Sequence, residues 1–215
     1  FMTATERLFR TNKEEYLSMD NPNYYGKIIY DLSFKKAIQD GIICDYKIIT
    51  FEITDTEINS IYSSNKFIQI KNEADDNITA REFATALALR KSFKQYKIKN
   101  AISFHHSIKR ANNFKKQQEY ISKIYKEYGE LETFHVSGSM PTSLRSKNMR
   151  SFASSKKALI TNARCLTEGV DLPSIDCVSF VDPKRSKIDI VQATGRALRV
   201  SDKKDYGYIL VPVFL

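Results

Sequence analysis

The 215-residue chain lacks several features that would place it in common classes of protein. No stretch approaches the roughly 18 consecutive apolar residues that a membrane-spanning helix needs, so no membrane segment is expected. The chain has three cysteines, Cys44, Cys165 and Cys177, an odd number without a C-x-x-C spacing. This argues against a disulfide framework and against a zinc site, and it predicts a reducing, cytoplasmic environment. The adjacent His105 and His106 would project to opposite sides of a strand, with no carboxylate or cysteine at ligand spacing, so no metal site is expected.

The loops that usually hold nucleotide phosphates are also missing from the sequence. No G-x-x-x-x-G-K-[ST] loop occurs, because Gly26-Lys27 is followed by Ile28 and position 21 is not glycine. A D-E-x-[HD] box is absent, and so is the G-x-G-x-x-G that would support a Rossmann-type enzyme. The chain alone is therefore expected to lack the means to hold Mg²⁺ and a triphosphate in the usual way.

The composition that remains is that of a globular protein with a basic surface. Hydrophobic residues make up 42% and charged residues 27% of the chain, and the net charge is +9. Such a charge suits a polyanionic partner. One helical stretch contains six basic residues, most of which are expected only to solvate its outer face. They are Lys109, Arg110, Lys115, Lys116, Lys123 and Lys126.

Strand and helix signals alternate from residue 100 onward. Thr142 and Ser186 are expected to cap two of the helices. The alternation predicts an α/β fold with a mostly parallel sheet and helices on both faces, and active sites at the carboxyl ends of the strands. The expected strands are 100–104, 133–136, 157–162, 177–181 and 206–213, and the expected helices are 108–128, 142–153 and 186–198.

The part of the chain before residue 100 shows weaker patterns. Ser33 is expected to cap a short helix that ends at Gly41, and residues 46–53 read as a strand. A capping box that starts at Thr79 opens a further helix. No internal repeat or low-complexity segment is present.

A Q-x-x-G-R-x-x-R pattern, made by Gln192, Gly195, Arg196 and Arg199, is the strongest chemical signal. Two arginines three residues apart on a helix share a face, and a guanidinium fork can hold two phosphate oxygens. Gly195 leaves room for the close approach of a ligand or of another backbone. The alternative interpretation is a basic helix end whose arginines satisfy the helix dipole.

About twenty residues upstream, the segment 161–173 contains Glu168-Gly169-Val170-Asp171-Leu172-Pro173. Together with the Q-x-x-G-R-x-x-R pattern it resembles motifs V and VI of superfamily 2 helicases and translocases. The resemblance runs from Ala101 to Arg199 and is nearest to bacterial restriction-subunit-like and repair-type helicases. It implies the second, RecA-like lobe of an ATP-dependent motor, a three-layer α/β domain with a mostly parallel central sheet.

The resemblance also implies an ATP site shared with a first lobe that this chain lacks. Arg196 and Arg199 correspond to the arginine fingers that reach the γ-phosphate, and Gln192 to a residue that positions them. Asp171 corresponds to a residue that binds the nucleotide ribose or orders the finger loop. The implied ATP-binding set is Glu168, Gly169, Asp171, Gln192, Gly195, Arg196 and Arg199, with ATP and Mg²⁺ held mainly by the missing lobe.

Other segments correspond to those that touch the nucleic-acid backbone in this family. Residues 101–107 resemble motif IV and contribute His105 and Ser107, and the loop with Ser137 and Gly138 precedes the next helix. The implied contacts of motif V are Thr161 and Asn162. Thr161 lies farther from Asp171 than its DEAD-box counterpart does, so Thr167 is a competing hydroxyl.

Each of these segments also has a purely structural interpretation. The loop at Ser137 can be a plain strand-to-helix connection, and the hydroxyls of Thr161 and Thr167 can serve turns or strands. The segment Asp182–Ser186 can link nucleic acid to nucleotide, or it can simply cap the following helix. These alternatives remain open at the level of sequence.

Thr3-Ala4-Thr5 resembles motif III, which closes the first motor lobe and couples the two lobes through Thr3 and Thr5. The chain is therefore expected to be a piece of a longer protein. Residues 1–30 would be the end of the first lobe and a linker, and residues 31–215 the helicase C-terminal domain, with a less regular part at 31–99.

The combined prediction is the second lobe of an ATP-dependent helicase or translocase. Its expected partners are a single-strand backbone, of DNA or of RNA, and the N-terminal motor lobe of the same protein, with no membrane partner. The fragment alone is expected to be inactive, because it lacks Walker A and Walker B motifs. The alternative is a non-catalytic nucleic-acid-binding or scaffolding module with a helicase-like fold.

Overall fold

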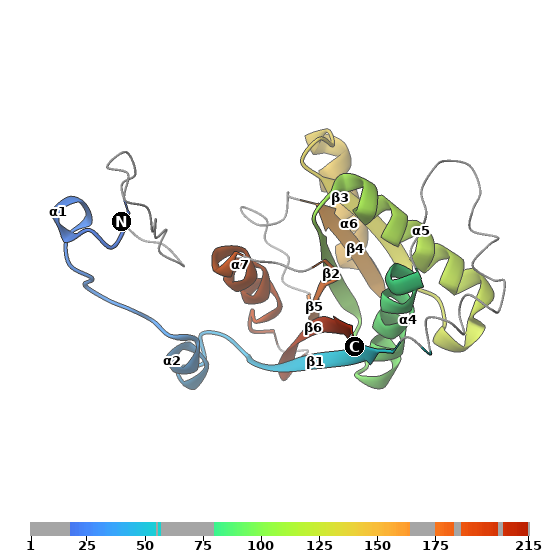
Figure 1. Cartoon of the computed structure of the whole chain (residues 1–215), viewed down its shortest axis with the longest axis horizontal. Helices are drawn as coiled ribbons and strands as arrows, with labels where there is room; N and C mark the ends of the chain where they lie inside the picture. The colour runs from blue at the N-terminus through green and yellow to red at the C-terminus, as the bar shows by residue number, and fades with distance from the viewer. Residues whose placement is uncertain are drawn as a thin grey trace.

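The computed structural model describes residues 18–54, 56, 80–163, 175–182, 186–201 and 204–214. The expected succession of strands and helices from residue 100 onward is confirmed (Figure 1). The described helices are α1 (Pro22–Tyr25), α2 (Phe34–Gln39), α4 (Ala80–Gln95), α5 (Ile108–Ile124), the 3-10 turn η2 (Lys126–Tyr128), α6 (Thr142–Ser154) and α7 (Lys187–Ala197). The strands are β1 (Asp45–Ile53), β2 (Asn100–His105), β3 (Glu132–Ser137), β4 (Ala158–Ala163), β5 (Cys177–Phe180) and β6 (Tyr206–Phe214).

The strands form one six-stranded sheet in the order β1-β6-β5-β2-β4-β3. Every ladder between them is parallel. β2, β4 and β5 occupy the middle of the sheet and are buried along their whole length. Buried parallel strands of this kind need helices on both faces of the sheet.

Two hydrophobic cores, one on each face, join the helices to the sheet. Side chains alternate between the faces along each strand, so Ala101 belongs to one core and Ile102 to the other. The first core contains Phe83 of α4 and Phe114 of α5. The second core contains Phe152 of α6, together with side chains of α7. The chain is thus a three-layer α/β structure in which α4 and α5 cover one face and α6 and α7 the other.

Several expected helix ends are confirmed and others are wrong. Ser33 and Ser186 cap α2 and α7 through their side chains, as expected. Thr142 does not cap α6, because Pro141 occupies the N-cap position and no side chain bonds there. α5 ends at Ile124 instead of Tyr128, since the chain tightens into η2 before Gly129. The capping box at Thr79 lies outside the described residues.

The segment before α2 extends away from the sheet (Figure 1). Its apolar side chains are exposed, including Tyr24, Ile28 and Ile29. The expected boundary at residue 30 stays a prediction.

Gly207 allows the end of α7 to lie directly against the beginning of β6. A Cβ atom at position 207 would come within 2.4 Å of the Ala197 carbonyl oxygen and 2.8 Å of a Leu198 methyl group. The backbone oxygen cannot swing away as a flexible side chain could. The close packing of α7 on β6 therefore depends on the missing side chain.

Gly207→Ala should destabilise the folded chain by roughly 1–3 kcal/mol, because the added methyl group overpacks the α7–β6 contact. Gly138→Ala is the matched control, since nothing lies within 4 Å of a Cβ atom built at that position. Urea unfolding of both variants and of the parent chain measures the difference. Equal stability of all three proteins would contradict this account of the packing.

Candidate functional site

The parallel sheet brings the carboxyl ends of its central strands together at one edge. His105 and Ser137 both pair in register with Ala163, at the ends of β2, β3 and β4. Phe104 pairs with Phe180 at the end of β5. The residues that follow these strands therefore share the edge where ligands bind in sheets of this type.

Asp182, two residues after the end of β5, is the centre of a polar cluster at this edge. It is 4% exposed. Its carboxylate accepts hydrogen bonds from the His106 backbone N–H at 2.9 Å and from Arg110 Nε at 3.1 Å, and it bonds His106 Nδ1 at 3.0 Å. Arg110 Nη2 lies 2.6 Å from the other carboxylate oxygen, and Nη1 forms an ion pair with Glu82 of α4. One guanidinium thus joins α4, α5 and the end of β5.

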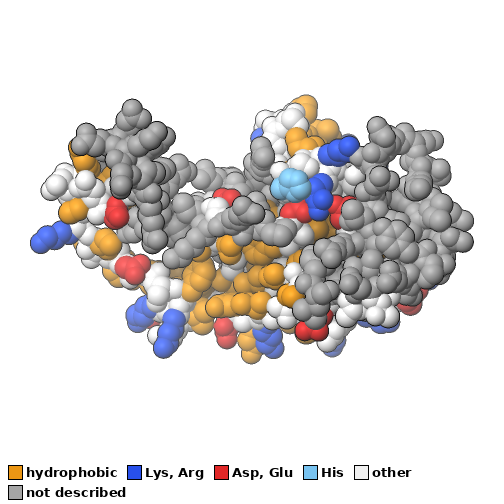
Figure 2. All heavy atoms as spheres, in the orientation of Figure 1, with side chains coloured by type: hydrophobic (Ala, Val, Ile, Leu, Met, Phe, Trp, Pro, Cys, Tyr) orange, Lys and Arg blue, Asp and Glu red, His pale blue; other side chains and the backbone are white. Residues whose placement is uncertain are grey.

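The pKa of Asp182 reflects this environment. Burial alone would raise the pKa of the carboxyl group. The hydrogen bond and charge of Arg110 and the backbone N–H of His106 outweigh burial, so the pKa lies below its usual value. Asp182 is therefore ionised at neutral pH. Figure 2 shows histidine, basic and acidic side chains side by side near the start of α5.

His105 lies beneath this cluster and has no access to a nucleic-acid strand. Its side chain is buried, and Nε2 lies 2.9 Å from Ser103 Oγ. Burial lowers the pKa of the imidazole to about 3. The ring is therefore neutral at pH 7, and its 3.9 Å separation from Asp182 is not an ion pair. The expectation that His105 contacts nucleic acid is corrected on this point, and the exposed neighbour His106 presents its ring instead.

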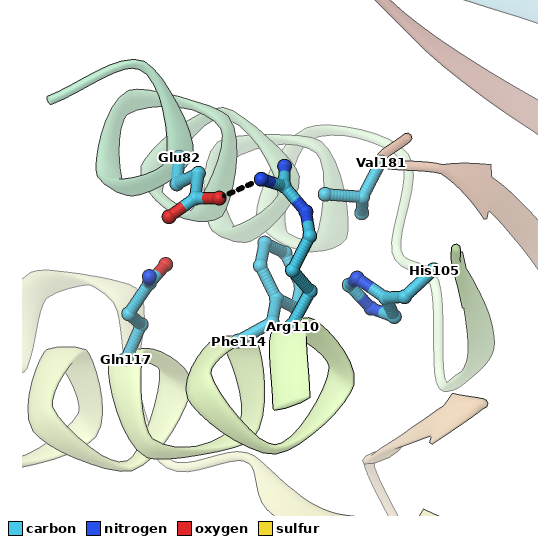
Figure 3. Close-up of a pocket in the computed structure, with 6 residues that line it drawn as sticks. All are labelled: Glu82, His105, Arg110, Phe114, Gln117 and Val181. Carbon is cyan, nitrogen blue, oxygen red and sulfur yellow. Dashed lines mark ion pairs between the residues drawn. The ribbon is translucent and has the colours of Figure 1, made fainter. Parts of the chain in front are cut away.

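A small hollow adjoins the cluster (Figure 3). Glu82, His105, Arg110, Phe114 and Gln117 line it together with Val181. Its volume is about 10 Å³. Such a space holds no more than about one water molecule. The cluster is therefore an arrangement of side chains rather than a ligand pocket.

Thr161 and Asn162, at the end of β4, are also buried. The Thr161 hydroxyl lies 3.0 Å from His135 Nδ1 and donates to the Phe134 carbonyl at 3.3 Å. This hydroxyl serves the sheet, as in the structural interpretation. The burial of these two side chains does not support direct contact with a nucleic-acid strand. Thr167, the competing hydroxyl, lies outside the described residues.

The loop between β3 and α6 is more accessible. Ser137 is buried, but Gly138 and Ser139 are exposed. The Ser137 and Ser139 hydroxyl oxygens lie 3.2 Å apart. No side chain caps the α6 N-terminus that follows Pro141. Backbone N–H groups at a helix N-terminus suit an anion such as a phosphate. Ser107, at the start of α5, instead uses its hydroxyl to cap that helix.

The arginines of the Q-x-x-G-R-x-x-R pattern lie away from this edge. α7 starts at the carboxyl edge and runs back along the sheet for 11 residues, about 16 Å at 1.5 Å per residue. Its C-terminal end lies against Gly207, near the start of β6. The Cys44 N–H also donates to the Leu198 carbonyl at 2.9 Å, just before β1 begins. The structure therefore separates two candidate sites at opposite ends of α7.

The two arginines do not share a helical face. Arg196 lies in the last turn of α7 and is 8% exposed, and burial lowers the pKa of its guanidinium. Arg199 lies beyond the end of α7, in an antiparallel bridge with Ile43, and is exposed. The expectation of a shared helical face is therefore wrong, and only the Arg199 side chain is exposed. Gln192 and Gly195 are half-buried, and open space surrounds the position where Gly195 would carry a Cβ.

Exposed apolar side chains surround Arg199. Ile42 and Val200 are each 56% exposed. Figure 2 shows a hydrophobic area over α7, β6 and β1. Lys204 Nζ donates to the Ala197 carbonyl, the last of α7, at 2.8 Å. The sequence patterns did not indicate this lysine.

Arg110 and Asp182 are the other residues whose importance the sequence understated. Arg110 is expected from the sequence to solvate a helix face, yet its guanidinium contacts two carboxylates. Both partners are far away in the chain, at positions 82 and 182. For Asp182, the sequence signal is its place after a strand, in the segment Asp182–Ser186 already noted above. Arg110 lies inside a helix and has no comparable signal.

Several expected site residues lie outside the described part of the chain. They are Thr3, Thr5, Thr167, Glu168, Gly169 and Asp171. Among the described residues, no group of three or more His, Cys, Asp or Glu side chains is placed to hold a metal ion. None of the described helices is long and apolar enough to cross a membrane.

The six-stranded parallel sheet and its two helical layers define a RecA-like α/β domain. The chain belongs to the family described as the helicase conserved C-terminal domain, which it matches over residues 84–201, more than half of its length. The expected family resemblance and fold class are both confirmed.

Known relatives agree with this assignment. Protein A859L of African swine fever virus (isolate Pig/Kenya/KEN-50/1950), named as a probable helicase, is 26% identical over 99% of this chain. The "Putative ATP-dependent helicase IRC3" of Saccharomyces cerevisiae is 24% identical over 86% of this chain. The chain spans 22% and 26% of the lengths of these two curated relatives.

Solved structures share the fold. The DNA-bound Type ISP restriction-modification enzyme LlaBIII superposes with a TM-score of 0.77 and 24% identity, covering 98% of this chain and 15% of that enzyme. A fragment structure of an HsdR subunit of a type I restriction enzyme from Vibrio vulnificus YJ016 superposes with a TM-score of 0.64 and 21% identity. The match covers 91% of this chain and 37% of the HsdR chain.

The lobe should lose stability as the pH falls from 7 to 4. His105 has a pKa of about 3 in the folded chain, compared with about 6.5 for a free imidazole. Between these values the unfolded chain binds a proton that the folded chain does not, so acid favours unfolding by on the order of 3 kcal/mol at pH 4. Urea unfolding at several pH values measures this loss.

His105→Gln removes the titrating group, keeps a buried polar side chain and should flatten the pH dependence. His106→Gln changes an exposed ring and serves as the control for losing a histidine. A pH dependence that is the same in His105→Gln as in the parent chain would rule out His105 as its source.

Proposed function

We propose that this chain is the second motor lobe of an ATP-dependent nucleic-acid helicase or translocase. Its roles are to supply Arg196 and Arg199 to ATP bound on the first lobe of the same protein and to hold a strand backbone at the carboxyl edge of the sheet. The observation that carries the proposal is the separation of these two sites by α7, within a fold that belongs to the helicase C-terminal family.

The end of α7 is well suited to meet another lobe. Arg199 is exposed among apolar side chains such as Ile42 and Val200. A protein surface with an arginine among apolar groups is typical of interfaces. Lys204 Nζ donates to the last carbonyl of α7, that of Ala197. Arg199 is therefore the finger expected to reach a phosphate first, and Arg196 the one that lies behind it.

The proposed chemistry is electrostatic. Negative charge builds up on the transferred phosphoryl oxygens in the transition state, and an arginine placed there neutralises it. Mg²⁺ and the triphosphate are assigned to the first lobe. Glu168, Gly169 and Asp171 are proposed to complete the nucleotide site, with Gln192 and Gly195 at the base of the finger segment.

Movement follows from closure and opening of the two lobes. ATP on the first lobe draws Arg199 and Arg196 inward, and hydrolysis releases them. Thr3 and Thr5 are proposed to take part in this coupling. Because both lobes grip the same strand, each cycle shifts one grip relative to the other and moves the protein along the backbone.

The proposed strand contacts lie in the loop before α6. Gly138 and Ser139 are exposed there, beside the uncapped N-terminus of the helix. His106, the start of α5 and Thr167 are the other candidates. The net charge of +9 favours any nucleic acid. DNA is the proposed strand because LlaBIII, which shares the fold, is bound to DNA in its structure.

Arg199→Ala in the intact protein should lower kcat for ATP hydrolysis by roughly 10³–10⁵-fold, the usual effect of removing an arginine finger. KM for ATP should change much less, because the contact matters mainly in the transition state. Steady-state ATPase assays measure both values. Arg196→Lys should also lower kcat, since an ammonium group cannot reproduce the two-pronged contact.

Two controls accompany this experiment. Lys123→Ala removes an exposed charge from the end of α5, on the opposite face of the sheet from α7, and should keep near-normal kcat. The isolated chain should show no ATPase activity, because its sequence contains no G-x-x-x-x-G-K-[ST] loop to hold the phosphates. Full activity of Arg199→Ala would refute the finger role. It would favour the alternative of a non-catalytic nucleic-acid-binding or scaffolding module.

Ser139→Asp should weaken single-strand binding by the isolated chain, because it places a negative charge where a phosphate is proposed to lie. A carboxylate near a helix N-terminus stabilises the helix, so lost binding could not be ascribed to a weakened α6. Ser154→Asp adds the same charge at the far end of α6 and is the matched control.

Fluorescence anisotropy at several salt concentrations measures this binding. The parent chain should bind weakly and lose affinity steadily as salt increases, by a slope of about 0.7 per phosphate contact in a logarithmic plot. Affinity that does not depend on salt, or equal losses in the two variants, would contradict the proposed contact.

A further inference from the structure

Arg110 occupies a structural position that differs from that of the other basic residues of α5. Its guanidinium lies in the first turn of the helix and contacts Asp182 with two nitrogens, Nε at 3.1 Å and Nη2 at 2.6 Å. The third nitrogen, Nη1, pairs with Glu82 of α4. Figure 3 shows the guanidinium between Glu82 and the side chains of His105 and Val181. Two helices and one strand end meet at this single group.

Asp182 is the last described residue before the segment that leads into α7. The next described residue, Ser186, is the N-cap of that helix. The Asp182 N–H lies at a long 3.4 Å from the Phe104 carbonyl, so the main chain holds it only weakly. By contrast, the Asp182 carboxylate has four contacts of 3.1 Å or less, two with His106 and two with Arg110. The side chain is thus the firmer anchor for the beginning of the connection to α7.

The electrostatics make this anchor depend on Arg110. Asp182 is buried, and a buried carboxylate needs a cation or several donors. The two-pronged contact fixes both the distance and the orientation of the carboxylate, which a point charge would not do. Removing the guanidinium would leave Asp182 free to turn towards solvent and to shift the connection with it.

We propose that Arg110 is a positioning residue for α7. Arg110 of α5, itself paired with Glu82 of α4, holds Asp182 in place. It thereby sets where α7 begins and, through the helix, where Arg196 and Arg199 are placed. This inference rests on the proposed function of those two arginines. His106 shares Asp182 with Arg110 and is 63% exposed. The same carboxylate therefore connects the proposed strand-binding edge with the proposed finger helix.

Arg110→Gln in the intact protein should lower kcat for ATP hydrolysis between about ten- and a hundredfold, the cost of a slightly misplaced catalytic group. KM for ATP should change by less than about threefold, because the first lobe holds the nucleotide. Lys115→Gln is the matched control. It removes one charge from the same helix by breaking an ion pair with Glu119, away from Asp182, and should leave kcat unchanged.

Amide hydrogen exchange gives a readout that does not depend on ATP hydrolysis. In Arg110→Gln, residues 187–197 should exchange several-fold faster than in the parent, whereas Lys115→Gln should leave their exchange unchanged. A double variant tests the pathway directly. If Arg110 acts through α7, adding Arg110→Gln to Arg196→Ala should lower kcat by less than it does alone.

The outcomes separate this inference from the proposed function. Full activity of Arg199→Ala would refute the finger role, and with it the reason for positioning α7. A large loss in Arg199→Ala together with normal kcat and normal α7 exchange in Arg110→Gln would overturn the positioning role alone. If Arg110→Gln does not fold, Arg110→Lys keeps the charge but not the fork. An intermediate kcat in that variant supports the proposal, and full kcat overturns it.

Discussion

Parallel pairing of the strands is the constraint on which the rest of the structure depends. Because all five ladders run in the same direction, every strand ends at the same edge, and every connection must cross back over a face of the sheet. The crossing helices bury both faces and create the two hydrophobic cores. The same geometry collects the polar ends of β2, β3 and β5 and carries the end of α7 to the opposite edge.

The separation of the two edges gives α7 its importance. One end of the helix begins near a buried carboxylate, Asp182, and the other end carries Arg196 and leads to Arg199. A rigid helix transmits a small shift at its start to its end. Close packing against β6, made possible by Gly207, restrains that movement at the arginine end. Contacts at the carboxyl edge can therefore bear on the arginine end of α7, about 16 Å away over the length of the helix.

Burial divides the family-type residues into two groups. His105, Thr161 and Asn162 are buried. His105 bonds Ser103 of its own strand, and Thr161 bonds His135 of the neighbouring β3. Arg199, Gly138 and Ser139 are exposed. The first group belongs to the scaffold that shapes the edge, and the second group is available to a partner. Motif membership alone does not distinguish the two.

The sequence alone determined the fold class and most of its elements, because the 2.0 and 3.6 periodicities of apolar residues are local properties. Ser33 and Ser186 were identified as caps for the same reason, since a capping hydroxyl bonds an N–H only a few residues away. The Q-x-x-G-R-x-x-R pattern also indicated the family directly, because its residues are contiguous in the chain.

What only the tertiary structure decided depends on contacts between distant residues. From the sequence, Arg110 is one of several basic residues on a helix surface. Only the folded chain brings Glu82 and Asp182 beside it. From the sequence, Thr161 is a candidate contact for a nucleic-acid strand. Pairing of β3 with β4 instead places its hydroxyl against His135. Arg196 and Arg199 share a face only if the helix continues past residue 197. The helix ends there, where Lys204 satisfies the Ala197 carbonyl and the chain turns to pair with Ile43. Burial, ion pairing and helix termination of this kind arise from packing, which local periodicity does not specify.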